Sequence, residues 1–285
     1  MIISFIVPEP SFLLDLVKPL EDLGHKILLN RCNDEVDVII CWSISVLRDG
    51  QNIKERFPNI PFIFYNWDMY HWIIDNPRGY DWKGCAELMK ISNQVWVPSD
   101  EVRQRQVEFF DVQTPTVTIK SFARFFEPTV PVEDKHYLVN FMRTQPDKYM
   151  GRFERACDEL DIPYISTDHS FSEIRFQEIL TKCTATVCPF YEASTGGLTA
   201  IEAYKFGKPV IMSDSPYMGG KEYFGDRAIY FKHDSYEEFK RVLMETFQNP
   251  PKLNISDCEN FCEQYKPEVV AKRVEDVLKL LLERR

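Results

Sequence analysis

The residues with the clearest chemical potential lie in one segment, residues 189–211. Gly196 and Gly197 follow an apolar run and precede a stretch at helical spacing, so the segment predicts a strand, a glycine turn and a helix. Glycines let the backbone approach a ligand closely, and the N–H groups and dipole of a helix N-terminus favour an anion such as phosphate. Glu202 lies on that helix, where a carboxylate can accept hydrogen bonds from vicinal sugar hydroxyls. For a lone Gly-Gly pair, a tight turn with a solvent-exposed glutamate is the commoner explanation.

A second group of charged residues lies upstream. Arg143 follows the apolar run 137–141, and Lys148 comes five residues later. An arginine fork and a lysine point charge at the carboxyl end of a strand would suit a diphosphate group and could neutralise its charge. The alternative is that both are ordinary surface charges, one at a strand edge and one at a helix start.

The 189–211 segment resembles the signature of the retaining nucleotide-sugar glycosyltransferases, the large family that includes glycogen and sucrose synthases. In that family a Tyr-Glu or Ser-Glu pair leads to Gly-Leu, then to a helix that carries Glu-Ala, and then to Gly-Lys-Pro-Val-Ile. This chain has the motifs in the same order: Tyr191-Glu192, Gly197-Leu198, Glu202-Ala203 and residues 207–211. The resemblance implies that Glu192 holds the donor sugar as a catalytic carboxylate and that Glu202 holds the ribose. It also implies that the donor diphosphate is bound at Gly196, Gly197, Leu198 and Thr199.

One spacing departs from the family. Its two glutamates are usually separated by seven residues, whereas nine residues lie between Glu192 and Glu202, so the phosphate loop is expected to be two residues longer. Ser194 occupies the position that has seven residues between it and Glu202. The first position of the motif therefore has two candidates, Glu192 and Ser194.

The segment of Arg143 and Lys148 resembles a second motif of the family, a strand-end Gly-Arg followed five residues later by Lys, with Met142 in place of the glycine. The resemblance implies that these two cations bind the donor diphosphate. It further implies that the nucleobase lies near residues 167–171, in which Phe171 is the candidate contact.

The acceptor side is expected in the first half of the chain. After the apolar run 61–65 the family often carries His-Asp, and this chain has Trp67 and Asp68 there, with His71 three residues further on. The resemblance makes Asp68 and His71 the catalytic candidates on that side. A single histidine beside two tryptophans is as often a packed loop residue.

Short apolar runs alternate with stretches at helical spacing, which is the pattern of an α/β protein with parallel sheets. The predicted strands are residues 2–7, 26–29, 36–42, 61–65, 94–97, 117–119, 137–141, 164–165, 185–188, 210–212 and 228–231. The predicted helices are residues 12–23 (with Ser11 as N-cap), 100–110, 148–160, 172–182, 198–206, 236–247 and 266–282. Prolines interrupt residues 125–131, which predicts a domain linker.

We therefore expect two Rossmann-like α/β domains, and the resemblance implies that they face each other across a cleft, as in glycosyltransferases of the B type. Residues 1–130 would form the acceptor-side domain and residues 131–262 the nucleotide-sugar-binding domain. Residues 263–285 would form a C-terminal helix that crosses back to the first domain.

The composition excludes several classes of protein. With 44% hydrophobic and 27% charged residues in 285, the chain is globular rather than disordered. Its net charge of −10 does not favour a general nucleic-acid or anionic-membrane binder. The apolar runs fall short of the ~18 residues that a membrane span requires, and the N-terminus predicts a first strand rather than a signal peptide. The eight cysteines lack paired metal-ligand spacing, so we expect free thiols and a cytoplasmic location.

The expected function is metal-independent transfer of a sugar, with retention, from a nucleoside diphosphate sugar to an acceptor hydroxyl. We expect no cofactor besides that donor and no metal, because Arg143 and Lys148 would do the work of a metal ion. The acceptor would be a glycan, a small molecule or modified DNA, as in bacteriophage base glucosylation, and the net charge argues against DNA. A nucleotide-sugar epimerase and a non-catalytic sugar-nucleotide-binding module are the alternatives.

Overall fold

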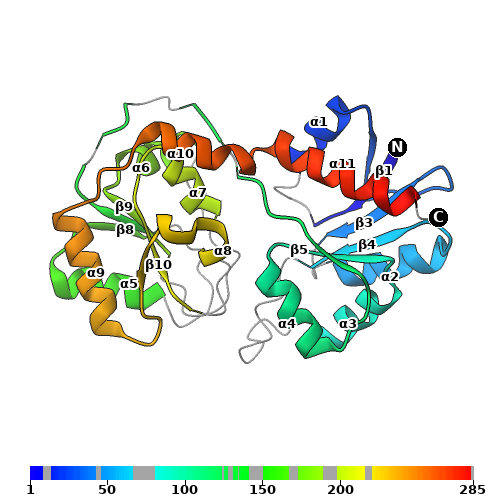
Figure 1. The fold of residues 1–285 in the computed structure, drawn as a ribbon, viewed down its shortest axis with the longest axis horizontal. Coiled ribbons are helices and arrows are strands. Elements are labelled where there is room, and N and C mark those ends of the chain that lie inside the picture. Colours follow the sequence, from blue (N-terminus) through cyan, green and yellow to red (C-terminus); the bar gives the residue numbers. More distant parts are fainter. Residues whose placement is uncertain are drawn as a thin grey trace. The chain divides into compact units, whose positions relative to one another are not determined.

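The computed structural model describes residues 1–8, 14–42, 46–66, 81–123, 125–127, 131–133, 135–140, 150–166, 173–188, 198–215 and 220–283. The chain divides into two compact units, each with its own sheet (Figure 1). Unit 1 comprises Met1–Phe122 and Tyr265–Arg285, and unit 2 comprises Ala123–Gln264.

The sheet of unit 1 has six parallel strands in the order β2-β1-β3-β4-β5-β6. Strands β3 and β4 are buried at every position, because helices cover both faces of a parallel sheet. The strands are β1 Ile2–Ile6, β2 Lys26–Leu29, β3 Val38–Trp42, β4 Phe62–Tyr65, β5 Gln94–Val97 and β6 Thr116–Thr118. The helices are α1 Leu14–Asp22, α2 Leu47–Arg56, α3 Trp82–Ile91, α4 Asp100–Phe110 and α11 Pro267–Glu283.

Local signals set the helix ends of unit 1. The Ser99 side chain accepts a hydrogen bond from the N–H of Val102 and caps α4, and Asp81 caps α3 by accepting from Gly84. Gly24 has φ +84° and turns the chain from α1 into β2, a conformation that favours glycine. The N-cap predicted at Ser11 lies outside the described residues.

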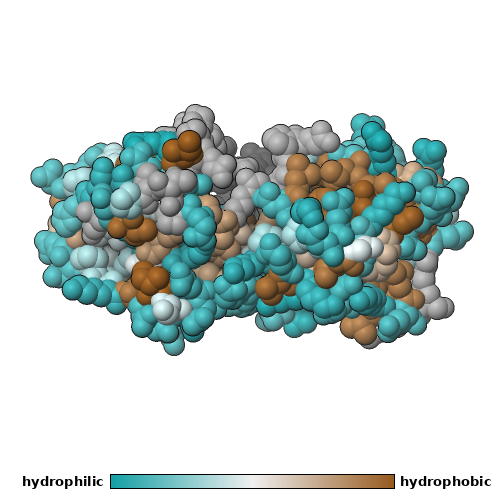
Figure 2. Space-filling model, turned by 90° about the horizontal axis from the view of Figure 1, so that it is seen from above, coloured by the Kyte–Doolittle hydropathy of each residue, from teal (hydrophilic) through white to brown (hydrophobic). Residues whose placement is uncertain are grey.

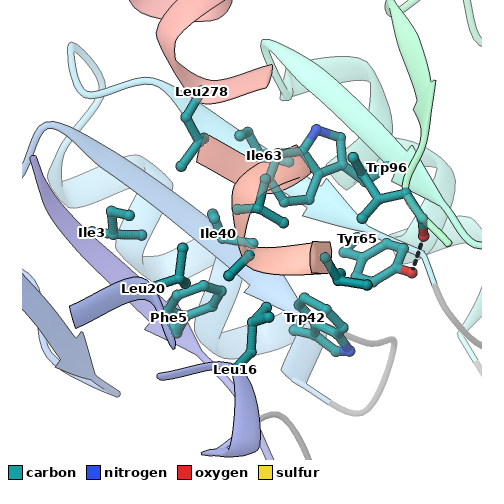
Figure 3. Packing of buried hydrophobic residues seen from close by; sticks show 14 of the residues in the cluster. Ile3, Phe5, Leu16, Leu20, Ile40, Trp42, Ile63, Tyr65, Trp96 and Leu278 are labelled. Atoms are coloured by element: carbon teal, nitrogen blue, oxygen red, sulfur yellow. Dashed lines mark hydrogen bonds between the residues drawn. The ribbon is translucent and has the colours of Figure 1, made fainter. Parts of the chain in front are cut away.

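The core of unit 1 joins the two ends of the chain. Helices α1 and α11 lie side by side on one face of the sheet (Figure 1). Leu20 of α1 and Leu278 of α11 pack on Ile40 of β3 in one apolar cluster (Figure 3). Toward the carboxyl ends of the strands, the rings of Trp42 and Tyr65 meet edge to face with 4.0 Å between their centroids. The C-terminal helix is therefore part of the core of unit 1 rather than an appendage.

The sheet of unit 2 has five parallel strands in the order β11-β10-β9-β7-β8. The strands are β7 Leu138–Asn140, β8 Tyr164–Ser166, β9 Ala185–Cys188, β10 Val210–Ser213 and β11 Ile229–Phe231. The helices are α5 Met150–Leu160, α6 Glu173–Lys182, α7 Leu198–Lys205, α8 Gly220–Phe224, α9 Tyr236–Gln248 and α10 Ile255–Cys262.

The stretch predicted as a linker begins unit 2. The Phe126 ring packs against Phe206 at 4.9 Å between centroids, and Lys205 Nζ donates to the Phe126 carbonyl oxygen at 3.4 Å. Buried Lys208 donates to the carbonyl oxygen of Glu133 at 2.7 Å. These contacts explain why the division falls after Phe122, whereas the sequence analysis placed it after residue 130.

The α/β class with two Rossmann-like sheets is confirmed, and every predicted strand is present to within about two residues. Helices α2, α3, α8 and α10 were not predicted. All eight cysteines lie in the described part of the chain, and no disulfide joins them, as predicted. The surface seen in Figure 2 is mostly hydrophilic, with separate apolar patches. Among the described helices, none combines the length and apolarity needed to cross a membrane.

Candidate functional site

The topology of unit 2 creates one favoured ligand position. The chain passes from β7 to β8 on one side of β7 and then returns to form β9 on the other side. Residues Leu138 and Val139 of β7 pair with Ala185 and Thr186 of β9. In open parallel sheets, ligands bind outside the carboxyl ends of the strands at such a reversal of strand order. For unit 2 this position is the carboxyl ends of β7 and β9.

The two segments predicted to bind the donor diphosphate follow these two strands. Arg143 and Lys148 come after β7, and Glu192, Gly196 and Gly197 come after β9. These five residues lie outside the described residues, so the structure fixes only the strand ends from which their segments depart. The two segments therefore follow neighbouring strands, because β7 and β9 are hydrogen-bonded to each other.

Four other predicted positions also fall outside the described residues. Phe171 follows β8, and Ser194 belongs to the segment after β9. Asp68 and His71 follow β4 in unit 1. Their roles stay predictions.

Helix α7 is the described part of the predicted donor motif. Leu198 and Thr199 form its first turn, and Glu202 lies about one turn further on. The Glu202 residue is only 7% exposed, so the alternative of a solvent-exposed helix glutamate is wrong. A carboxylate buried to this degree requires polar or cationic partners, which is compatible with a ligand-binding role.

Helix α10 holds α7 in place. The Tyr204 ring meets Phe261 at 5.3 Å between centroids, and Cys262 Sγ donates to the Ile201 carbonyl oxygen at 3.5 Å. Burial raises the pKa of Tyr204 to about 12, so this side chain is a neutral phenol and serves packing. The sequence analysis did not predict α10 and therefore missed this support.

The structure explains why the Gly-Lys-Pro motif begins with a glycine. Gly207 has φ +69°, and a Cβ at this position would come within 2.4 Å of Ile255 Cδ1. Only glycine therefore fits both the conformation and the contact with α10. Gly207 turns the chain from the end of α7 toward the amino end of β10, which is parallel to β9.

An aspartate–histidine pair at the same edge was not predicted. Asp214 follows β10, and its Oδ1 accepts the backbone N–H of His233 at 2.8 Å and lies 3.2 Å from His233 Nδ1. Arg152 of α5 donates to the His233 carbonyl oxygen at 3.2 Å. These bonds fix the connection between β11 and α9. The aspartate directly after an apolar strand is the signal that could have suggested it.

Unit 1 also places a buried polar residue at its carboxyl edge. Asn66 follows β4 directly, is fully buried, and donates its backbone N–H to the Trp96 carbonyl oxygen at 2.9 Å. Its Nδ2 donates to Cys85 Sγ of α3 at 3.7 Å. Asn66 thereby anchors the start of the segment that carries Asp68 and His71. In the described part of both units, no group of three or more histidine, cysteine, aspartate or glutamate side chains could hold a metal ion.

Solved structures of other proteins share this fold. A sucrose-phosphate synthase from Thermosynechococcus elongatus has a TM-score of 0.76 at 10% sequence identity, with 100% of both chains covered. HepE from Anabaena, in complex with UDP and glucose, has a TM-score of 0.70 at 12% identity, covering 98% of this chain and 100% of its own. The lipopolysaccharide outer core galactosyltransferase WaaB, in its apo form, has a TM-score of 0.70 at 12% identity, covering 98% and 99%.

These similarities confirm the predicted fold, that of glycosyltransferases of the B type with two Rossmann-like units. At 10–12% identity they establish the fold alone. No protein-family model and no curated protein sequence matches the chain.

Proposed function

We propose that this protein is a retaining glycosyltransferase that moves a sugar from a nucleoside diphosphate sugar to an acceptor hydroxyl without a metal ion. The observation that carries the proposal is the pairing of β7 with β9 at the reversal of strand order in unit 2. This pairing lets two motifs that are far apart in the sequence leave the sheet at one ligand position. Both motifs have the chemistry that a diphosphate and a sugar require.

The charges and hydrogen-bonding groups of these residues suggest their roles in binding the donor. Arg143 and Lys148 neutralise the diphosphate as it leaves, and the free N–H groups at the start of α7 add to this stabilisation. Glu202, already buried on α7, accepts hydrogen bonds from the ribose hydroxyls. Glu192 holds the donor sugar, with Ser194 as the alternative in the shorter register.

In the proposed reaction the bond between the anomeric carbon and the diphosphate oxygen breaks. The acceptor oxygen bonds to the anomeric carbon on the same face, and its proton passes to the released nucleoside diphosphate. Asp68 and His71 are the proposed residues on the acceptor side. Because the two cations of unit 2 supply the positive charge, turnover would be unchanged by a metal chelator.

The fold neighbours suggest the substrate class. HepE was solved with UDP and glucose, and WaaB is named as a galactosyltransferase of an outer core lipopolysaccharide. We infer a UDP-hexose as the first donor to test and a sugar hydroxyl as the acceptor. Modified DNA gains no support from these neighbours.

Binding and turnover test the proposal in two steps. Nucleoside diphosphates should raise the melting temperature of the protein in a concentration-dependent way, because they bind only the folded state. A UDP-sugar with a panel of sugar acceptors should then release UDP and form an anomer of unchanged configuration. Bound donor that is never turned over would indicate a binding module, and donor isomerised without an acceptor would indicate an epimerase. The absence of any nucleotide binding would refute the proposal.

A further inference from the structure

The apolar face of β7 and β8 ends in two polar residues. Leu138 and Tyr164 pack into the core of unit 2 with Phe153 of α5. Side chains alternate between the faces of a strand, so Asn140 and Ser166, two residues further along, share that face. They are also paired in register, as the last residues of their strands. A polar pair therefore replaces apolar packing at the carboxyl edge of this face.

The hydroxyl of Ser166 lacks a hydrogen-bond partner within the described part of the chain. Its Oγ is shielded from solvent, and none of the donors and acceptors that the structure describes lies within bonding distance. Polar groups hidden from water are nearly always hydrogen-bonded, because leaving one unpaired costs stability. An unpaired hydroxyl at a ligand-binding edge is therefore explained best by a partner that arrives with the ligand.

The position of Ser166 in the fold indicates which part of a ligand it meets. β7, α5 and β8 form a strand–helix–strand unit beside the reversal of strand order. In dinucleotide-binding units of this kind, the phosphates lie after the first strand, and the ribose of the nucleoside is bound by an acidic side chain about 20 residues further along. Ser166 lies 23 residues after Arg143 and ends the second strand.

The side chain of Ser166 also indicates which part of the nucleoside it would contact. A carboxylate at this position would suit ribose hydroxyls, but serine is neutral and its hydroxyl can both donate and accept a hydrogen bond. The proposed function already assigns the ribose to Glu202, which follows β9 on the other side of β7. The polar edge of the base is then the part of the nucleoside that remains for Ser166.

We propose that the Ser166 hydroxyl hydrogen-bonds the base of the donor nucleotide and selects among bases. This inference rests on the proposed function, since it requires a nucleoside diphosphate at the edge of unit 2. It adds a residue that determines donor specificity.

The test compares the affinities of UDP, GDP, ADP and CDP for four forms of the protein by titration calorimetry. The forms are the wild type, Ser166→Ala, Ser166→Thr and Thr186→Val. Thr186 is the matched control, because its hydroxyl is also buried without a partner among the described residues but lies on the opposite face of the sheet. Melting temperatures establish that each variant is folded.

For the base that the wild type prefers, Ser166→Ala should lower the affinity about 3- to 10-fold, the value of one neutral hydrogen bond. The affinities for the other bases should change less, so the preference shrinks. Ser166→Thr keeps the hydroxyl and should keep the preference, and Thr186→Val should bind like the wild type. Equal losses for all four nucleotides, or none, with folded Ser166→Ala would overturn the inference while leaving the proposed function standing. A wild type that binds no nucleoside diphosphate would overturn both.

Discussion

His25 and Glu275 meet in the interior of unit 1, with 3.4 Å between His25 Nε2 and Glu275 Oε1. Both residues are buried, and they join the turn before β2 to helix α11. The Met1 amino group lies 3.4 Å from His25 Nδ1 on the opposite side of the ring. Glu275 also accepts hydrogen bonds from Lys272 and Lys279 of its own helix. The C-terminal helix thus contacts the turn before β2 through polar side chains as well as packing on the first sheet through apolar ones.

This arrangement predicts a loss of stability in mild acid. Burial, helped by the Met1 ammonium and Lys279, lowers the pKa of His25 below its ordinary value of 6.5, although Glu275 opposes the shift. Below pH 6.5 the unfolded chain therefore binds a proton at His25 before the folded chain does, and the free energy of unfolding falls with pH. Melting temperatures measured from pH 7.5 to 5 should fall less steeply in His25→Gln than in the wild type. Equal slopes would contradict the prediction.

The hydrogen bonds from Lys272 and Lys279 lower the pKa of Glu275 to about 2. A carboxylate with a lowered pKa stabilises the fold above its unfolded value of 4.5, and this contribution disappears as the pH falls toward 2. Glu275→Gln should therefore melt below the wild type at pH 7, with a gap that narrows below pH 4.5. For the His25→Gln experiment, His233→Gln is the control, because His233 lies in unit 2, away from the contact between His25 and Glu275. A gap that is independent of pH would show that the loss arises from packing alone.

Gly207→Ala should be more damaging than the same change at Gly24. Both glycines have positive φ, which costs an alanine about 1–2 kcal/mol. A Cβ on Gly24 would meet nothing within 4 Å, whereas one on Gly207 would overlap Ile255 Cδ1. The overlap should add about 1–3 kcal/mol in chemical denaturation. Ile255→Val removes the overlapping methyl group, so Gly207→Ala should cost less in that background. Equal costs for both glycines would show that the contact with α10 is unimportant.

Arg143→Ala and Lys148→Ala should each lower turnover about 100-fold or more, the scale expected when one electrostatic stabiliser of a leaving group is lost. Steady-state rates with a UDP-sugar provide the measurement. Arg241→Ala is the matched control, since this arginine is exposed on α9 and pairs with Glu245. Wild-type rates in both folded variants would remove the two cations from the donor site.

Glu192→Gln and Glu202→Gln should impair different properties of the enzyme, turnover in the first and nucleotide affinity in the second. Glu202 is placed at the ribose, far from the breaking bond, so its variant should bind both donor and free nucleoside diphosphate more weakly. Glu192 is placed where charge develops, so its variant should mainly lose turnover. Product titrations beside steady-state rates separate the two effects. If Glu192→Gln loses product affinity and Ser194→Ala loses turnover, the shorter register is correct.

The parts of the fold that could be predicted from the sequence carry strong local patterns. Apolar runs such as those of β3 and β4 identify buried parallel strands directly. Helix α2 lacks such a signal, because its N-cap residue, Val46, provides no side-chain cap and the helix from Leu47 is mostly polar. Its Gly50 is explained only by the structure, since a Cβ there would come within 2.6 Å of Cys41 Sγ.

Some residues of the candidate site could likewise be predicted from the sequence, and others could not. Glu202 could be found from its motif, because the residues around it are contiguous in the chain. The sequence could suggest Asp214 from its place directly after an apolar strand, but not its pairing with His233 or that of Asn66 with Cys85, because the partners of each pair are 19 positions apart and the fold brings them together. Ser166 was missed for another reason: a hydroxyl becomes informative only when its burial and its lack of a partner in the described structure are known.

The position of α11 has a consequence for biosynthesis. Unit 2 is one continuous stretch, whereas unit 1 needs Tyr265–Arg285 as well as Met1–Phe122. A ribosome therefore releases all of unit 2 before it releases the helix that closes the core of unit 1. Until then the apolar cluster that contains Ile40 and Ile63 would lack the side chains that α11 contributes to it, among them Val274 and Leu278. The nascent chain should depend on chaperones at that stage, and a stop codon that removes α11 should yield an aggregating product with an intact unit 2.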